Sequence, residues 1–204
     1  MSTLKTNFIS HTANSAAVYT LPQTDGSAGQ VLQTNGSGVL SWVTLPSGGL
    51  TVAQTFRQTA TSATNNSATT FTSNWEKSDG TGEGGYGSFA DPSSGVFTFP
   101  TTGFYYVTFS SYFEDSGYST NCYIQIQATT DNSSYSTIST THFGTTYDQS
   151  GNNYQSGFVN AILDVTDVTQ VKVKFKAFSN SSVSWDGSET QDRTSATFLR
   201  IGDT

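Results

Sequence analysis

The chain has 204 residues, of which 34% are hydrophobic, 13% aromatic and only 11% charged, and its formal net charge is −7. This negative field repels phosphate backbones and anionic lipid, so neither nucleic acid nor a membrane is expected as a partner. Abundant Thr and aromatic residues favour strands, while Ser, Asn and Gly favour turns over helices. We therefore expect an all-β protein with one main core and a polar, mostly uncharged surface.

Residues 1–49 predict an extended arm. No apolar run follows the first residues, so we expect a soluble chain without a standard export signal. Turn clusters lie at Asp25-Gly26 and Asn35-Gly36. The second cluster separates residues 30–32 from residues 39–42 and predicts a small hairpin with a two-residue turn, since Asn and Gly both tolerate positive φ.

The arm has too few apolar side chains to build a core, so we expect it to dock on another protein. Pro46-Ser47-Gly48-Gly49 predicts a flexible break. The expected organisation is an attachment arm at 1–49 and a folded knob at 50–204. The docking residues would be the larger apolar groups of the arm: Leu4, Phe8, Ile9, Val18, Leu21, Val31, Leu32 and Trp42.

From residue 50 onward the sequence predicts eight to ten strands, which is typical of a sandwich or barrel. Residues 171–178 alternate between apolar side chains and lysines, which predicts one wet face. Residues 104–109 are apolar on both faces, so this strand is expected to lie between its own core and a second surface. That surface is either a subunit interface or an exposed sheet covered by tyrosine. The expected strands are 51–60, 69–75, 86–90, 95–99, 103–113, 120–129, 135–143, 154–165, 169–178 and 193–201.

The spacing of Phe97, Gly103, Tyr105 and Phe109 resembles the signature of the globular head of the q subunit of the first complement component. Val107 departs from it, because the family has Phe there. The resemblance covers about residues 51–204 and implies a ten-stranded jelly roll of the complement and tumour-necrosis-factor type, which assembles as a compact homotrimer. The trimer contact and core would then be built by Phe97, Phe99, Gly103, Tyr105, Val107 and Phe109.

Residues 21–42 resemble a linker found in tail-fibre and head-fibre proteins of phages. The shared pattern is Leu-Pro-x-Thr-Asp-Gly-x-x-Gly-Gln-Val-Leu followed by Asn-Gly-x-Gly-x-Leu-x-Trp, and it begins here at Leu21 and ends at Trp42. This resemblance implies a virion protein that binds other virion proteins through its arm. Such a protein would be made in the host cytoplasm and displayed on the virion surface, and the sequence leaves open whether it sits on the head or the tail.

Catalytic and metal-binding patterns are weak. His11 and His142 are isolated, and Cys122 is expected to be a small buried side chain on a strand. Asp164 and Asp167 fit a strand that ends in a turn better than a catalytic pair. We expect neither an enzyme nor a cofactor. Calcium binding stays open, and the loop acids that would have to converge are Asp79 with Glu83, or Asp186 with Glu189 and Asp192.

Two functions are compatible with these patterns. The leading hypothesis is a structural virion surface protein of a phage, a trimeric short fibre or capsid decoration with a docking arm and an outward-facing knob. The alternative is a receptor-binding, lectin-like tip that recognises a host surface glycan. Aromatic residues that lie among Ser, Asn and Gly could stack on sugars, but they could equally cover sheet edges and subunit contacts. The residues of this kind are Tyr86, Tyr118, Tyr135, Tyr147, Tyr154 and Trp185.

Overall fold

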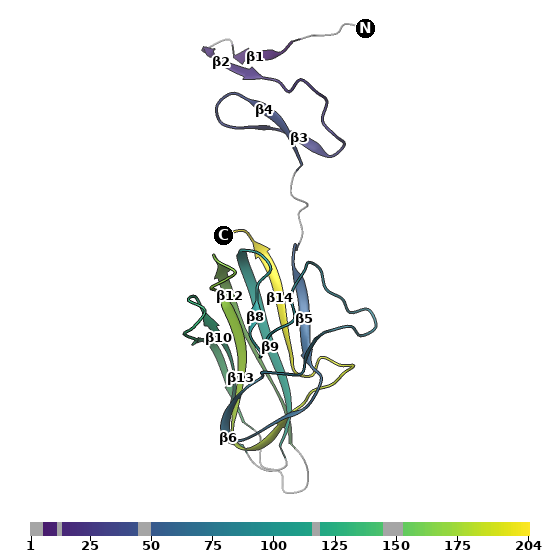
Figure 1. Cartoon of the computed structure of the whole chain (residues 1–204), viewed down its shortest axis with the longest axis vertical. Coiled ribbons are helices and arrows are strands. Elements are labelled where there is room, and N and C mark those ends of the chain that lie inside the picture. The colour runs from purple at the N-terminus through teal and green to yellow at the C-terminus, as the bar shows by residue number, and fades with distance from the viewer. Residues whose placement is uncertain (1–5, 12–13, 45–49, 116–118, 145–152) are drawn as a thin grey trace. The chain divides into compact units, whose positions relative to one another are not determined.

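The computed structural model describes residues 6–11, 14–44, 50–115, 119–144 and 153–204. All the regular secondary structure in these ranges is β-strand, which confirms the predicted all-β class (Figure 1). The chain divides into two compact units, Met1–Gly49 and Leu50–Thr204. In the described part of the chain, no helix is long and apolar enough to span a membrane.

The Met1–Gly49 unit contains two antiparallel hairpins. A hairpin lies where Asn35-Gly36 predicted one, but the expectation of a two-residue turn is wrong. Thr34 pairs with Leu40, and the loop between them has positive φ only at its two glycines, Gly36 and Gly38. Asn35 instead accepts hydrogen bonds on its side-chain oxygen from the backbone of residues 37 and 39. The hairpins are formed by β1 (Phe8–His11) with β2 (Asn14–Thr20) and by β3 (Gln30–Thr34) with β4 (Leu40–Thr44).

The Leu50–Thr204 unit is a sandwich of two layers. The first layer has the strand order β12-β9-β14-β5-β7, and these strands are β5 (Ala53–Gln58), β7 (Trp75–Lys77), β9 (Gly103–Asp115), β12 (Asn153–Val165) and β14 (Ser195–Gly202). The second layer has the order β11-β10-β13, with β6 and β8 on the other edge of β13. Its strands are β6 (Ser62–Thr70), β8 (Phe97–Thr98), β10 (Cys122–Thr129), β11 (Ser136–Phe143) and β13 (Lys172–Trp185). The layers join where residues 183–185 of β13 pair with the end of β9.

Aromatic rings fill the space between the layers. Phe109 on β9 stacks on Phe175 on β13 with ring centroids 4.7 Å apart, and this contact joins the layers directly. Phe97 lies at the centre of the cluster, 5.2 Å from Phe56 and 5.1 Å from Phe198. A few large rings therefore build most of the core, in keeping with the low hydrophobic and high aromatic content.

Several local expectations can be compared with the strands that form. The alternation at residues 171–177 is confirmed, because the apolar positions are buried and the lysines are half-buried. Residues 86–90 were expected as a strand, but the only bridge there joins Tyr86 to Ala53. Cys122 is fully buried and free, as expected, and burial raises the pKa of its thiol. It is therefore a packing residue and a poor nucleophile.

Candidate functional site

The six residues expected at the core and trimer contact lie inside a single chain. Five of their side chains are at most 3% exposed: Phe97, Phe99, Tyr105, Val107 and Phe109. Gly103 has φ 139, and a Cβ there would lie 2.5 Å from the Arg200 side chain and from the Gly202 carbonyl oxygen, so only glycine fits. These residues fill the core of one subunit. Their side chains are therefore not available to a second subunit, whereas the other face of the same strands is open.

The outer face of β12, β9 and β14 carries an apolar patch at one end. Residues paired across antiparallel strands lie on the same face, and Ile162, Tyr106 and Leu199 form one row across the three strands. Phe104 is the next outward-facing residue along β9, whereas Phe158 lies two outward-facing positions from Ile162 on β12, beyond Asn160 and opposite Ser110. In a single chain Ile162 is 64% exposed, Phe158 55% and Phe104 38%. We refer to Phe104, Tyr106, Ile162 and Leu199 as the apolar patch.

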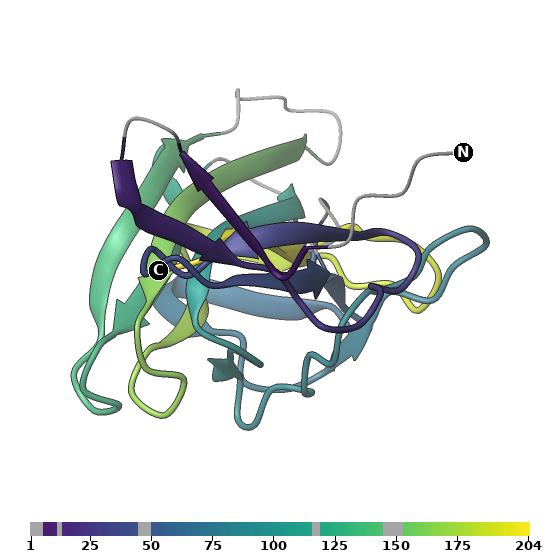
Figure 2. The same ribbon diagram turned by 90° about the horizontal axis from the view of Figure 1, so that it is seen from above.

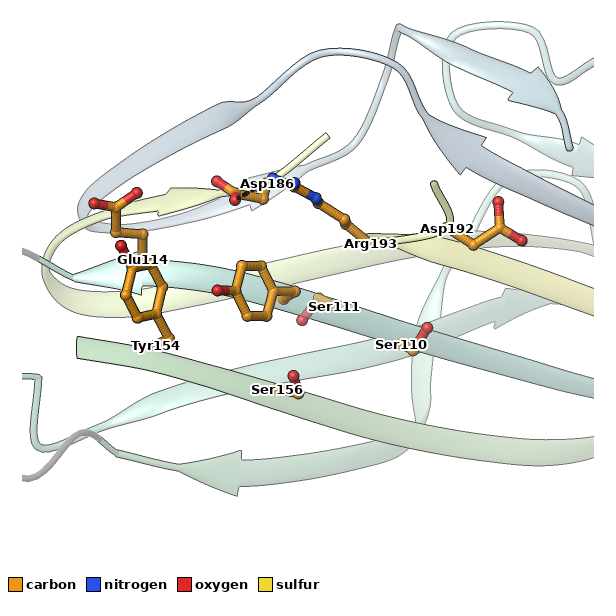
Figure 3. Close-up of a pocket in the computed structure, with 9 residues that line it drawn as sticks. Ser110, Ser111, Glu114, Tyr154, Ser156, Asp186, Asp192 and Arg193 are labelled. Carbon is orange, nitrogen blue, oxygen red and sulfur yellow. Dashed lines mark hydrogen bonds and ion pairs between the residues drawn. The ribbon is translucent and has the colours of Figure 1, made fainter. Parts of the chain in front are cut away.

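The same face carries a polar pocket at its other end (Figure 3). The pocket has a volume of about 610 Å³. In Figure 3, Asp186 and Arg193 come from the segment before β14 and lie across the pocket from Ser156 on β12. The lining residues are Ser110, Ser111, Tyr112, Glu114, Tyr154, Ser156, Asp186, Asp192 and Arg193.

Two tyrosine rings form one wall of the pocket. Tyr112 on β9 and Tyr154 on β12 are nearly parallel, with an angle of 7° between the ring planes and 5.8 Å between the centroids. Tyr154 is 53% exposed. Burial raises the pKa of the Tyr112 phenol, and Tyr154 raises it further, so this hydroxyl stays protonated and able to donate a hydrogen bond.

A buried cation lies beside the pocket. The Arg57 side chain is only 1% exposed, and its guanidinium contacts four carboxylates, those of Glu76, Asp79, Glu83 and Asp192. Burial alone would lower the pKa of Arg57, but hydrogen bonds to Glu76 and Asp79 outweigh it and raise the pKa. The loops after β7 and before β14 lie side by side in both ribbon views (Figures 1 and 2), and Ser78 donates a 2.7 Å hydrogen bond to Asp192 between them.

This arrangement accounts for most of the loop acids that were candidate calcium ligands. Asp79 and Glu83 pair with Arg57, which supplies the positive charge that an ion would otherwise bring. Asp186 pairs with Arg193 at 3.2 Å. Among the residues that the structure describes, no group of three or more His, Cys, Asp or Glu is placed to hold a metal ion.

Four of the six aromatic residues suggested for sugar stacking lie in the described part of the chain. Tyr86 is 63% exposed but lies outside the pocket, and Tyr135 is half-buried, with the Lys174 ammonium 4.1 Å from its ring centroid. Trp185 is fully buried, and its indole nitrogen donates to Thr64 at 2.9 Å, so the suggestion is wrong for this residue. Tyr154 lines the pocket. Tyr118 and Tyr147 lie outside the described residues. Tyr112 was missed, although the period-2 alternation of β9 places it on the outer face in phase with Tyr106.

The arm residues expected to dock fall into three groups. Phe8, Ile9, Val31 and Leu32 are between 38% and 57% exposed, so they are open to a partner. Leu21 and Trp42 are half-buried. Trp42 donates from its indole nitrogen to the Thr24 carbonyl oxygen at 2.8 Å, and it contributes to the fold of its own unit. Leu4 and the side chain of Val18 lie outside the described part of the chain.

Comparisons with known proteins bear on the fold. No family model matches the chain, and no curated protein matches it. The solved structure of Eiger TNF from S. frugiperda is similar over 75% of this chain and 94% of that chain, with a TM-score of 0.57 and 14% sequence identity. The fold is a tumour-necrosis-factor-like jelly roll. Murine APRIL at pH 5.0 matches 74% of this chain and 98% of its own at 12% identity, with a TM-score of 0.49. The similarity to Eiger confirms the predicted jelly-roll fold class.

Proposed function

We propose that this chain is a non-catalytic structural protein of a phage particle, a trimeric short fibre or capsid decoration. In this proposal the Leu50–Thr204 jelly roll forms the trimeric knob, and the Met1–Gly49 unit attaches it to other virion proteins. The observation that carries the proposal is the apolar patch, which a single chain leaves open to water.

Exposed apolar residues scattered one by one need no explanation, but a contiguous group on one face indicates an interaction site. Three residues of the patch form a row across three hydrogen-bonded strands, so they are held on a rigid surface. A rigid, largely apolar surface loses little conformational entropy on association. The resemblance to complement-type and tumour-necrosis-factor-type jelly rolls favours a closed threefold ring as the form of that association.

Two features support attachment through the arm. Its resemblance to phage fibre linkers spans residues 21–42, and its hairpins leave Phe8, Ile9, Val31 and Leu32 open to a partner. Covering these side chains would supply the driving force for docking. A Gly-rich segment at 45–49 separates them in sequence from the jelly roll.

The second candidate function is a receptor-binding tip that recognises a host surface glycan. The polar pocket with its two parallel tyrosine rings favours it. The two functions are compatible, since a virion protein can hold its knob on the particle and still bind a ligand with it.

The proposal is tested on the full chain and on particles. Light scattering should give a mass near three times the 21.8 kDa of one chain. Gold-labelled antibody against residues 50–204 should decorate intact particles when they are imaged by electron microscopy. A mass of one chain at micromolar concentration would contradict the trimer. Particles that the antibody does not label, and in which mass spectrometry does not detect the chain, would contradict the assignment to the virion.

A further inference from the structure

We propose that the polar pocket between β9, β12 and the segment before β14 binds a neutral or amino saccharide. This deepens the second candidate function by giving it a site and a ligand class. It rests on the proposed function only in requiring that trimer assembly leave this end of the outer face open.

The pocket lies at the end of the jelly roll that is remote from Leu50. Ala53 at the start of β5 pairs with Leu199, which pairs with Tyr106 inside the apolar patch. At the end of the same strand Arg57 pairs with Ser195, which pairs with Ser110 at the edge of the pocket. The outer face is therefore apolar near the point where the arm joins and polar at the far end.

The tyrosine pair offers a platform for a pyranose ring. One face of a pyranose is lined by C–H groups and is apolar, and an aromatic ring provides the matching surface. Tyr154 has the exposed surface to receive it, and stacking on Tyr112 holds the ring in place. A tyrosine platform also costs little entropy on binding, because the side chain has only two rotatable bonds to fix.

The remaining lining groups suit sugar hydroxyls, each of which both donates and accepts. Arg193 donates to Asp186 at 3.2 Å while 45% of its side chain stays exposed, so it can also donate to a ligand. Ser110 and Ser195 share a hydrogen bond of 3.0 Å, and Ser156 adds an exposed hydroxyl from β12. The carboxylates of Asp186 and Glu114 are acceptors. Donors and acceptors thus lie beside an aromatic surface, which suits the hydroxyls and the C–H face of a sugar together.

Charge selects among saccharides. Three carboxylates line the pocket, those of Glu114, Asp186 and Asp192, against the one guanidinium of Arg193. This excess of negative charge repels sialic and uronic acids and favours neutral or amino sugars. It argues equally against phosphate-bearing ligands.

The test uses the full-length chain on an array of neutral, amino, sialylated and uronic oligosaccharides. The strongest neutral or amino hit is then titrated by saturation-transfer NMR, with lactose and N,N′-diacetylchitobiose as fixed probes. We expect neutral or amino saccharides to bind and acidic ones to fail. Tyr154→Ala and Arg193→Ala should each weaken binding about tenfold, whereas Tyr19→Ala, at an exposed tyrosine of the Met1–Gly49 unit, should not.

Thermal unfolding of each variant verifies that it is folded, and Tyr154→Phe, which keeps the ring, should retain most of the binding. The proposal is overturned if no neutral or amino saccharide binds, if acidic ones bind best, or if the two pocket variants bind like the wild type. If no saccharide binds but the chain is a trimer, the saccharide site is wrong and the structural function is unaffected. If a saccharide binds to a chain that is monomeric, the site is supported and the trimeric form is contradicted.

Discussion

Replacing Ile162 with Glu tests the apolar patch where it is most exposed. Burying an Ile side chain completely stabilises by about 1.5 to 3 kcal/mol. Since 64% of Ile162 is exposed in one chain, covering it contributes about 1 to 2 kcal/mol per subunit, or about 3 to 6 kcal/mol in a trimer. A carboxylate buried there without a partner adds several kcal/mol per subunit against assembly. Ile162→Glu should therefore lower the association constant of the trimer by at least about 10⁴-fold.

The assay is size-exclusion chromatography with light scattering at micromolar concentration. We expect Ile162→Glu to run as a single 21.8 kDa chain with unchanged far-ultraviolet circular dichroism, because the side chain faces away from the core. Tyr86→Glu is the matched control, since Tyr86 is 63% exposed but lies outside the patch, and it should remain a trimer. If Ile162→Glu keeps the wild-type mass, the patch is not the subunit contact and the reasoning fails.

Three further predictions concern stability. Tyr105→Ser should destabilise the jelly roll by about 2 to 5 kcal/mol, because it deletes a fully buried ring. Tyr105→Phe should destabilise it by only about 1 kcal/mol, because it keeps the ring and loses the hydrogen bond to the Thr101 carbonyl oxygen. Equal denaturant midpoints for the two variants would contradict this prediction. Arg57→Ala should lower the free energy of unfolding by about 2 to 3 kcal/mol, less than breaking a fully buried ion pair would, because the partner carboxylates are partly solvated. Salt at 1 M should restore part of this stability, because it screens the repulsion among the carboxylates. A loss of stability that does not change with salt would show that Arg57 contributes through packing alone. Backbone hydrogen bonds from Ser134 and Ser133 and a hydroxyl bond from Thr129 hold the pKa of Asp131 well below its ordinary value. Its contribution is therefore complete above about pH 4 and is lost as the pH falls further, so Asp131→Asn should show a smaller drop in melting temperature between pH 7 and pH 3 than the wild type.

The sequence predicts the strands whose side chains alternate clearly. Residues 171–177 form a strand in which Val, Phe and Ala are buried and the lysines are half-buried. Successive side chains of a strand point to opposite faces, so this alternation predicts one buried face and one face toward solvent. Strand β6 is harder to predict, since residues 62–70 contain only Ser, Thr, Asn and Ala. It forms because it pairs with β13, a contact more than 100 positions along the chain. Tertiary pairing overrides weak local preference there.

The candidate site was only partly predictable, for two physical reasons. Residues 104–109 predict a strand that is apolar on both faces, but this pattern cannot say which face meets a partner. The structure buries the odd-numbered positions of β9 and leaves Phe104 exposed. The pocket and the Arg57 cluster each combine segments distant in sequence, such as Arg57 with Asp192, and local patterns carry no signal for such contacts.

The division between knob and arm is the central claim, and particle incorporation tests it most directly. Full-length chain and a chain of residues 50–204 would be supplied in turn to a phage that lacks the gene, and the copy number in purified particles would be measured by quantitative mass spectrometry. Circular dichroism and light scattering would establish that the shortened chain is a folded trimer before it is used. The account predicts that the full-length chain enters particles and that residues 50–204 do not. Incorporation of residues 50–204 at the full-length level would place the attachment surface on the jelly roll and contradict the account.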